Sequence, residues 1–324
     1  MSENMLQAKK DFSRFALALF VIGIVTVIVQ ILLAVLWELV LRDTGLGQLE
    51  IMQWLLTMGP MYLIAVPIGF ALIKKIAPEE TAKHKLTGRG FLVMMLICMP
   101  IMYGGNYIGN LFSALFSGGN AENPVVNMVA DKPLYAFIFA VLLAPFLEEF
   151  IFRKQLIDRL GKYGERIAIF FSAITFSLFH MNLFQFFYAF GLGLIFAYVY
   201  TRTRMLRYPV LMHMIINFMG SVLAPMLVSS LDMELTEKIA MGTATAEETA
   251  QMLGPVLAFD LYVFLLLGSI IAGVVFLIRR WKKRIFLPAS SQLPYRGYVQ
   301  VVYWNPGMLL FTAFCLIMII LALF

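Results

Sequence analysis

Charged side chains are scarce in this chain, and their scarcity excludes an ordinary water-soluble domain. Of the 324 residues, 14% are charged and 61% are hydrophobic, whereas a typical soluble domain carries about 25% charged residues. A soluble fold of this length cannot bury so much apolar surface, but a lipid bilayer accepts it directly. The net charge of +6 does not indicate nucleic-acid binding, because the basic residues fall in short clusters between apolar runs. Such clusters are typical of the cytoplasmic loops of membrane proteins.

Cysteine is nearly absent, and this excludes a disulfide-based scaffold. The two cysteines, Cys98 and Cys315, both lie within apolar runs, so we expect no disulfide framework. An apolar run from Phe15 to about Val35 follows a basic N-terminal segment. The run is too long for the core of a signal peptide, and no small-residue cleavage site follows it, so we expect a first membrane helix that is retained.

The apolar runs themselves predict an all-α, polytopic membrane protein. A membrane-spanning helix needs about 20 mostly apolar residues, and nine stretches meet or approach this length. They are 15–41, 51–73, 91–116, 134–152, 167–183, 184–201, 207–229, 256–278 and 307–324. No linker, low-complexity segment or internal repeat divides the chain, so we predict one transmembrane domain over residues 1–324.

The basic residues predict the orientation of these nine helices. With the N-terminus in the cytoplasm, all of the 25 lysines and arginines except Arg42, Lys132 and Lys238 fall on the cytoplasmic side. This distribution obeys the positive-inside rule, and adding or removing one helix would destroy it. The largest external loop, at about 230–255, is acidic and is expected to be a solvated connector.

Ionisable residues within predicted spans are costly and usually indicate function. Of the three histidines, His84 lies in a basic loop, whereas His180 and His213 lie within spans, as do Glu148 and Glu149. Asn217 follows His213 by four residues, so the two share one face of a helix. A structural lock between helices, or hydrogen-bonded contacts between them, remains an alternative explanation for each of these features taken alone.

Spacing separates the roles of the two neighbouring glutamates. Glu149 and Arg153 are four residues apart with the acid first, which favours an ion pair within the helix. Adjacent helical residues point about 100° apart, so Glu148 remains a free carboxylate that can take a proton from water. Pro145 removes a backbone hydrogen bond and is expected to bend the helix, which opens room for water and substrate.

A turn at residues 161–165 places Glu148 and His180 at similar depth. Glu148 precedes Gly164 by 16 residues and His180 follows it by 16. In a helical hairpin that closes at this glycine, the two side chains are expected to face one another.

Three motifs in this region resemble a known family. Residues 148–153 read EEFIFR and match EExxxR, residues 176–180 read FSLFH and match FxxxH, and residues 213–217 read HMIIN and match HxxxN/D. In this order and spacing they resemble the CAAX protease and bacteriocin-processing family (CPBP, also called Abi), which includes the Ras-converting CAAX endopeptidase. The resemblance places the peptidase core at about 134–229.

The resemblance implies hydrolysis of a peptide bond within the membrane. Glu148 would be the general base, and His180 would orient or share the attacking water. His213 and Asn217 would stabilise the tetrahedral oxyanion, and Glu149 and Arg153 would support them. The site would lie in a cavity among the helices predicted at 134–152, 167–183 and 207–229.

The sequence leaves the role of a metal open. Glu148, His180 and His213 are a possible zinc ligand set, with water as the fourth ligand. Against zinc, no HExxH spacing places two ligands on one helix face, and the Asn217 position suits an oxyanion donor better than a zinc ligand. We therefore favour a cofactor-free, glutamate-dependent mechanism, with zinc as the alternative.

These features together predict an intramembrane endopeptidase of a prokaryotic plasma membrane. Its partners would be the lipid bilayer and a membrane-associated or exported peptide, with no nucleic acid. By family analogy the pathway would be bacteriocin or pheromone maturation, or self-immunity. The alternative is a non-catalytic immunity or regulatory scaffold that binds a peptide. A transporter or proton relay ranks third. It would show inverted repeats and broken helices in both halves, and the sequence gives no sign of either.

Overall fold

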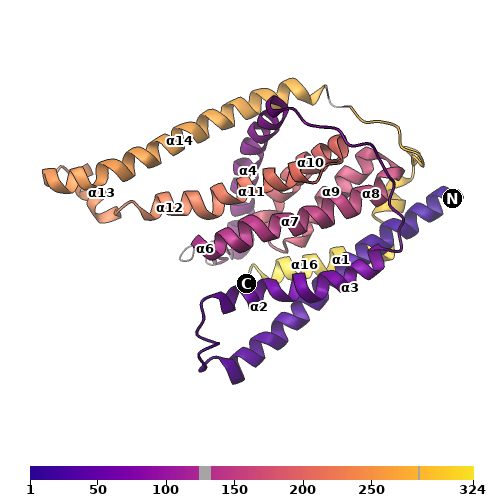
Figure 1. Ribbon diagram of the computed structural model, residues 1–324, viewed down its shortest axis with the longest axis horizontal. Helices are drawn as coiled ribbons and strands as arrows, with labels where there is room; N and C mark the ends of the chain where they lie inside the picture. The colour runs from indigo at the N-terminus through magenta and orange to yellow at the C-terminus, as the bar shows by residue number, and fades with distance from the viewer. Residues whose placement is uncertain (124–132, 284) are drawn as a thin grey trace.

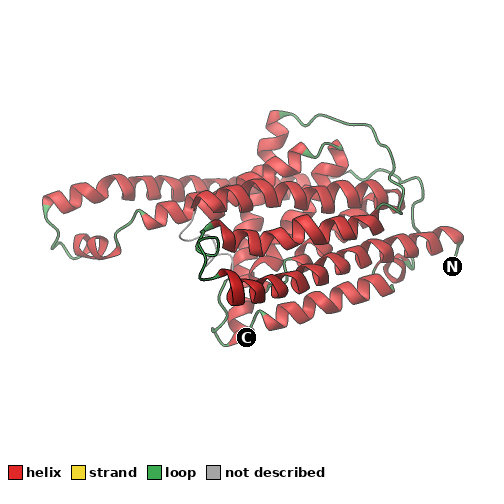
Figure 2. Cartoon of the chain, turned by 60° about the horizontal axis from the view of Figure 1, so that its bottom comes forward, coloured by secondary structure: helices red, strands yellow, loops and turns green. Residues whose placement is uncertain are grey.

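The protein is built from helices, as the composition predicts (Figures 1 and 2). The computed structural model describes residues 1–123, 133–283 and 285–324, and these described residues contain no β-strand. Helices suit a bilayer because they pair their backbone polar groups internally, where no water is present to do so. The predicted all-α membrane fold is therefore confirmed.

The chain folds through a long series of helical segments, several of which join end to end. In order these are α1 (Glu3–Leu36), η1 (Trp37–Leu41), α2 (Ile51–Gly59), η2 (Pro60–Ala65), α3 (Val66–Ile73), α4 (Gly88–Ser117), α6 (Pro133–Tyr135), η3 (Ala136–Leu143), α7 (Ala144–Glu149), η4 (Phe150–Gln155), α8 (Leu156–Leu160), η5 (Gly161–Tyr163), α9 (Glu165–Phe179), α10 (Leu183–Thr203), α11 (Arg207–Phe218), η6 (Met219–Leu223), α12 (Ala224–Ser229), α13 (Met233–Ala240), α14 (Ala246–Trp281), α15 (Tyr298–Val302) and α16 (Pro306–Leu321). The η segments are π-helical turns within longer helices, except η5, which is a 3₁₀ turn.

Within the described residues, seven continuous helices are long and apolar enough to cross a membrane. They are Glu3–Leu41, Ile51–Ile73, Gly88–Ser117, Pro133–Tyr163, Leu183–Thr203, Arg207–Ser229 and Ala246–Arg280. The two remaining predicted spans, 167–183 and 307–324, correspond to α9 and α16, which have 15 and 16 residues. The count of nine spans and the cytoplasmic N-terminus stay predictions, as does the single domain over residues 1–324.

The short length of α9 has a direct structural consequence. Fifteen residues extend about 22 Å at 1.5 Å per residue, less than the roughly 30 Å thickness of a bilayer's hydrocarbon core. The helix ends at Phe179 with His180 as its C-cap, and Met181 then adopts a left-handed conformation with φ of 55°. The chain reverses there and α10 begins at Leu183. A helix long enough to cross the bilayer would carry its last residue to the membrane surface. Because α9 is shorter than that, we expect His180, at its end, to lie within the thickness of the membrane.

The helix α10 lies at the centre of the bundle, against α4 and α9. Two glycines on α4 permit the close contact, as small residues commonly do between membrane helices. A Cβ atom at Gly105 would lie 2.6 Å from the backbone of Tyr188, and one at Gly109 would lie 2.6 Å from the carbonyl oxygen of Leu183. The start of α10, next to His180, is therefore fixed against α4.

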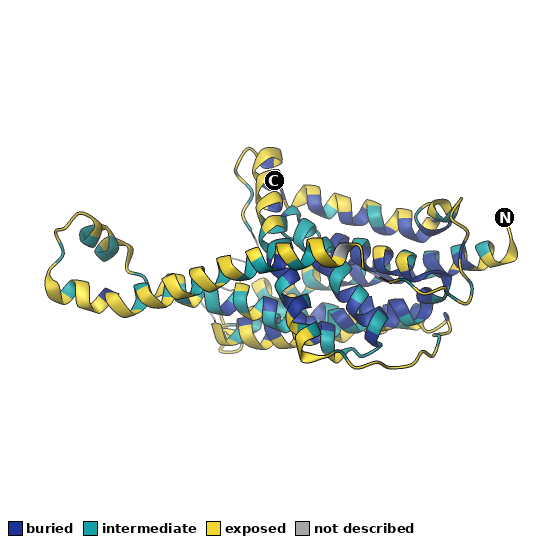
Figure 3. Ribbon diagram, turned by 90° about the horizontal axis from the view of Figure 1, so that it is seen from above, coloured by how far each residue is buried: buried dark blue, intermediate teal, exposed yellow. Residues whose placement is uncertain are grey.

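The helix α14 projects from the bundle, with α13 folded back beside its first turns (Figure 1). Figure 3 shows that much of its surface is exposed, and only 6% of its most apolar 18-residue stretch is buried. Thr245 and Glu248 cap its first turn reciprocally, so the helix begins at a defined residue. An apolar, largely uncovered helix of this kind is suited to contact with lipid.

The turn that joins α8 to α9 forms where the glycines predict it. Gly164 has φ of 137°, a conformation that favours glycine. The turn is anchored to α1, because the Tyr163 hydroxyl donates to Asp11 Oδ2 at 2.8 Å and Lys162 Nζ lies 3.3 Å from the same oxygen. An ion pair between Arg202 and Glu165 joins α10 to the start of α9. The predicted helical hairpin is thus present and fixed at its closed end.

The predicted orientation is testable with single cysteines. In a background with Cys98→Ala and Cys315→Ala, we expect a membrane-impermeant maleimide to label Thr243→Cys in intact cells. Lys83→Cys should react only after the membrane is permeabilised, because its loop is predicted to be cytoplasmic. Both positions are exposed in the structure, so labelling reports the side of the membrane. The reverse labelling pattern would contradict the cytoplasmic N-terminus.

Candidate active site

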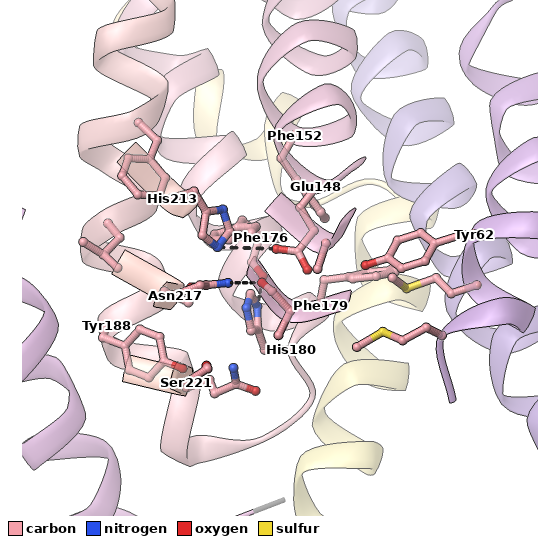
Figure 4. A pocket seen from close by; sticks show the side chains of 18 residues that line it. Tyr62, Glu148, Phe152, Phe176, Phe179, His180, Tyr188, His213, Asn217 and Ser221 are labelled. Atoms are coloured by element: carbon pink, nitrogen blue, oxygen red, sulfur yellow. Dashed lines mark hydrogen bonds and ion pairs between the residues drawn. The ribbon is translucent and has the colours of Figure 1, made fainter. Parts of the chain in front are cut away.

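The four residues predicted as catalytic lie around one cavity. The cavity has a volume of about 240 Å³, and its lining includes Glu148, His180, His213 and Asn217 (Figure 4). Glu148 comes from α7, His180 from the end of α9, and His213 and Asn217 from α11. The structure therefore brings together side chains from the three predicted helices, while their chemical roles stay predictions.

The predicted ion pair between Glu149 and Arg153 is present and fully buried. Arg153 Nε lies 2.9 Å from Glu149 Oε2, and Arg153 Nη2 donates to Glu149 Oε1 at 3.2 Å. Both side chains have 0% exposure. The arginine also donates to Ser172 Oγ at 3.1 Å, and that hydroxyl donates in turn to the carbonyl oxygen of Phe152. A buried charge pair is tolerated when its remaining hydrogen-bonding groups are satisfied in this way.

Glu149 makes a further contact that its spacing to Arg153 does not predict. Its Oε1 lies 3.0 Å from Nδ1 of His213, on a different helix. A carboxylate in an ion pair with arginine accepts hydrogen bonds, so the contact assigns the proton to Nδ1 of His213, which donates it. A carboxylate that fixes a histidine tautomer in this way also fixes the orientation of the ring. The free Nε2 of His213 then points toward Glu148.

Glu148 remains the free carboxylate of the site. Its Oε2 lies 3.9 Å from Nε2 of His213, which is beyond direct hydrogen-bond distance, and its side chain is 20% exposed. A polar separation of this size suits a bridging water. The neighbouring glutamates thus differ as predicted, since Glu149 is engaged in the protein interior and Glu148 faces the cavity.

His180 is held by the backbone of its own helix. Its Nδ1 lies 2.8 Å from the carbonyl oxygen of Phe176, so Nδ1 carries the proton and Nε2 is left as an acceptor. Asn182 fixes the following turn, since its amide nitrogen donates to the carbonyl oxygen of His180 and its amide oxygen caps α10. The predicted similar depth of His180 and Glu148 agrees with their common cavity.

Phe176, the aromatic residue of the second motif, packs against three of the polar side chains. Its ring lies edge-on to His180 at 4.7 Å and to His213 at 5.9 Å between ring centroids. The guanidinium carbon of Arg153 lies 4.4 Å from the centre of the same ring, at a distance typical of a cation–π contact. The phenylalanine therefore closes one wall of the cavity and holds both imidazoles in place.

Asn217 is fixed by a carbonyl group that Pro145 releases. In the π-helical register of η3, the backbone N–H of Ala144 donates to the carbonyl oxygen of Phe139. The next donor in that register would be residue 145, but proline has no N–H, so the carbonyl oxygen of Ala140 is left free. The Asn217 amide nitrogen donates to this oxygen at 2.8 Å. Pro145 was expected to open the helix, and the structure shows that the freed carbonyl orients Asn217.

The cavity also has walls that lie outside the three motifs. The helix α10 contributes Gln185 and Tyr188, and the α2–η2 segment contributes Met58, Met61 and Tyr62. Neither helix was predicted to form part of the site. No spacing rule connects residues near 60 with a motif that begins at residue 148, so only the tertiary fold shows this contribution.

The donor arrangement does not form a ready metal site. Among the described residues, no group of three or more His, Cys, Asp or Glu side chains is placed to hold a metal ion. Nδ1 of both histidines is engaged by protein oxygens, which leaves Nε2 of each as the nitrogen that could bind a metal. The zinc alternative with Glu148, His180 and His213 therefore stays a prediction, and we derive no chemical step through a metal.

Fold and cavity together define an integral membrane protein with a buried Glu, His, His and Asn site. Residues 130–219 match the family of type II CAAX prenyl endopeptidases described as Rce1-like. The matched segment contains all three motifs. The resemblance that the motifs predict is thereby confirmed over this part of the chain.

Two bacterial membrane proteins are similar to this chain. The membrane-embedded CAAX protease MroQ of Staphylococcus aureus (strain USA300) is 32% identical over 143 residues, which are 40% of this chain and 53% of MroQ. YdiL of Bacillus subtilis (strain 168), named as a membrane peptidase of unproven activity, is 25% identical over 164 residues, which are 48% of this chain and 66% of YdiL. The chain thus matches between about half and two-thirds of each relative's length. No solved structure matches it significantly.

The buried ion pair predicts a large difference between two adjacent substitutions. Arg153→Met leaves Glu149 buried without its partner, and should lower the free energy of unfolding by about 3–5 kcal/mol. Lys154→Met is the matched control, because Lys154 forms an i, i+4 pair with Asp158 but is 47% exposed. The control substitution should lower the free energy of unfolding by no more than about 1 kcal/mol. Unfolding in detergent measures both, and equal effects would contradict the structural role of the pair.

Proposed function

We propose that this protein is an intramembrane endopeptidase in which Glu148 activates water. The observation that carries the proposal is that two adjacent carboxylates have different surroundings, one fully engaged by the protein and one facing the cavity. Glu149 is locked by Arg153 and His213, while Glu148 faces the cavity with the free Nε2 of His213 3.9 Å away. The family match and the bacterial relatives support peptide-bond hydrolysis as the reaction.

The proposed reaction uses the free groups of the site. Glu148 removes a proton from a water molecule while the water oxygen attacks the carbonyl carbon of the peptide bond. The Nε2 atoms of His180 and His213 are acceptors in the tautomers described above, so one of them orients that water by accepting its other hydrogen. Glu148 then returns the proton to the leaving amine, which breaks the C–N bond and restores the carboxylate.

Stabilisation of the oxyanion involves Asn217. One hydrogen of its amide group is held by the carbonyl oxygen of Ala140, which leaves the second for the substrate. His213 donates to the oxyanion only when Nε2 also carries a proton, because Nδ1 is already committed to Glu149. Donors placed where negative charge develops are among the most effective parts of a hydrolytic site.

The cavity lining favours an apolar substrate segment near the cleaved bond. Most of the lining is apolar, with Met58, Met61, Phe179 and Leu192 among the side chains, and its described residues include no lysine or arginine. Such a lining offers no counter-charge to an anionic substrate group. We therefore propose a membrane-associated or exported peptide as substrate, and by family analogy its maturation or a role in self-immunity.

Peptide cleavage by the purified protein tests the proposal. In detergent or nanodiscs, with a peptide library read by mass spectrometry, wild type should cleave and Glu148→Gln should be at least about 100-fold slower, because it lacks the base. Glu38→Gln is the control, since Glu38 is an exposed partner of Arg42 outside the cavity, and it should retain full activity.

Two results would contradict the proposed mechanism. Cleavage lost in a strong chelator and restored by zinc would show that a metal takes part. Full biological function of Glu148→Gln in cells, together with no cleavage by wild type, would favour a non-catalytic scaffold that binds a peptide.

A further inference from the structure

Tyr62 brings a polar group into the cavity from outside the motif core. It lies on η2, and Figure 4 shows it entering from the side opposite His213, with Glu148 between them. Its hydroxyl oxygen is buried and has no hydrogen-bond partner among the described residues. The motifs gave no indication of this residue, because η2 lies far before them in the chain.

The position of Tyr62 is set by rigid packing. The segment from η2 to α3 lies against α1, and a Cβ atom at Gly69 of α3 would lie 2.3 Å from the Ile22 side chain on α1. Helices in such close contact have little freedom to move the ring out of the cavity. Buried polar groups in proteins are nearly always hydrogen-bonded, so an unpaired hydroxyl at the cavity wall indicates a partner that enters the cavity.

The second amide hydrogen of Asn217 is the one donor assigned so far to the oxyanion, and Tyr62 is placed to supply another. The Asn217 amide has given one hydrogen to the carbonyl oxygen of Ala140, and His213 Nε2 is an acceptor in its neutral form. The described lining residues include no lysine or arginine to balance the negative charge of a tetrahedral intermediate. A tyrosine hydroxyl is a neutral donor that is compatible with an apolar wall.

We propose that Tyr62 donates a hydrogen bond to the carbonyl oxygen of the cleaved peptide bond. The bond strengthens as that oxygen becomes an oxyanion, and no covalent bond to the tyrosine forms. This inference rests on the proposed peptidase function and adds a catalytic residue that the family motifs do not contain.

Tyr62→Phe tests the inference, because it removes only the hydroxyl. Loss of one oxyanion donor lowers kcat about 100- to 1,000-fold in other hydrolases, and we expect a fall of at least about tenfold here with KM nearly unchanged. The Tm of the variant should not fall, since the hydroxyl has no partner in the free protein. Tyr103→Phe is the control: its hydroxyl lies 3.2 Å from that of Tyr262, outside the cavity, so kcat should stay unchanged.

The possible failures can be told apart. Unchanged kcat in Tyr62→Phe, while Glu148→Gln is inactive, would overturn the role of Tyr62 and leave the peptidase function intact. A fall in Tm with a parallel fall in active protein would show a structural role only. A wild type that neither cleaves the peptide library nor binds peptide aldehydes, which mimic the intermediate as hydrates, would overturn both proposals.

A second feature, independent of the cavity, lies where the carboxyl end of α14 meets the amino end of α4 (Figure 1). An apolar groove of about 140 Å³ is lined there by side chains that include Ile97, Ile169 and Leu194. It continues into a wider mouth of about 400 Å³, whose lining includes Arg279, Arg280 and Lys283. The two hollows share Met94, Tyr198 and Arg280, so they form one groove that is apolar inside and basic at its mouth.

The cations at this mouth lack the acidic partners that several other basic residues of the chain have. Arg153, Lys154 and Arg202 each pair with an acidic side chain. Arg279, Arg280 and Lys283 are exposed and form no ion pair with any residue in the described parts of the chain. Three unneutralised cations at one mouth attract a phosphate group.

We infer that this groove binds an anionic phospholipid. The phosphate would lie among Arg279, Arg280 and Lys283, and an acyl chain would fill the apolar part of the groove. Charge and shape both favour this occupant, since the phosphate of a zwitterionic lipid is already balanced by the lipid's own cation and a soluble phosphate leaves the groove empty. Basic clusters next to a membrane helix commonly recognise anionic lipids in this way.

Native mass spectrometry of the intact protein with defined lipids tests the site. Wild type should retain phosphatidylglycerol at least about tenfold better than phosphatidylcholine with the same acyl chains. The combined variant Arg279→Gln, Arg280→Gln and Lys283→Gln should lose this preference. The control variant Lys9→Gln, Lys10→Gln and Arg14→Gln removes the same charge at the start of α1 and should keep it. Equal loss of the lipid preference in both variants would show that only the general surface charge matters. Displacement of phosphatidylglycerol by soluble glycerol 3-phosphate at equal concentration would show that the acyl chain does not contribute to binding. Either result overturns the inference.

Discussion

A carboxylate that is completely removed from solvent, that of Glu149, organises the polar centre of this protein. It binds Arg153 on its own helix and His213 on α11, at 2.9 and 3.0 Å. Removing either partner would leave a charge or a polar group unsatisfied in the protein interior, which is energetically costly. The contact fixes α7 against α11, sets the tautomer of His213, and leaves Glu148 as the carboxylate that faces the cavity.

Two local departures from regular helices complete the same arrangement. The early end of α9 leaves His180 inside the bundle rather than at its surface, and the left-handed Met181 turns the chain into α10. The proline at position 145 frees the carbonyl oxygen of Ala140, which then orients Asn217. Each irregularity places one polar side chain at the cavity, and the buried Phe176 ring packs between the resulting imidazoles.

The sequence predicts the parts of this arrangement that depend on local spacing. The Glu149–Arg153 pair follows from the i, i+4 spacing, the hairpin from glycines, and the membrane fold from apolar runs. The Glu149–His213 and Asn217–Ala140 contacts join residues 64 and 77 positions apart, and Tyr62 enters from a helix outside the motifs. Such contacts depend on how helices pack, which periodicity does not specify. The segment 167–183 was predicted as a short stretch that approaches the length of a span, and its helix, α9, ends at Phe179.

The histidine tautomers provide the most direct test of the central role of Glu149. The chain has three histidines, His84, His180 and His213, so ¹⁵N NMR of histidine-labelled protein, with His84→Gln to remove the loop signal, resolves the two in the cavity. We expect both to carry the proton on Nδ1, His213 because it donates to Glu149 and His180 because it donates to the carbonyl oxygen of Phe176. A His213 proton found on Nε2 alone would contradict the Glu149–His213 contact and the orientation of the cavity that depends on it.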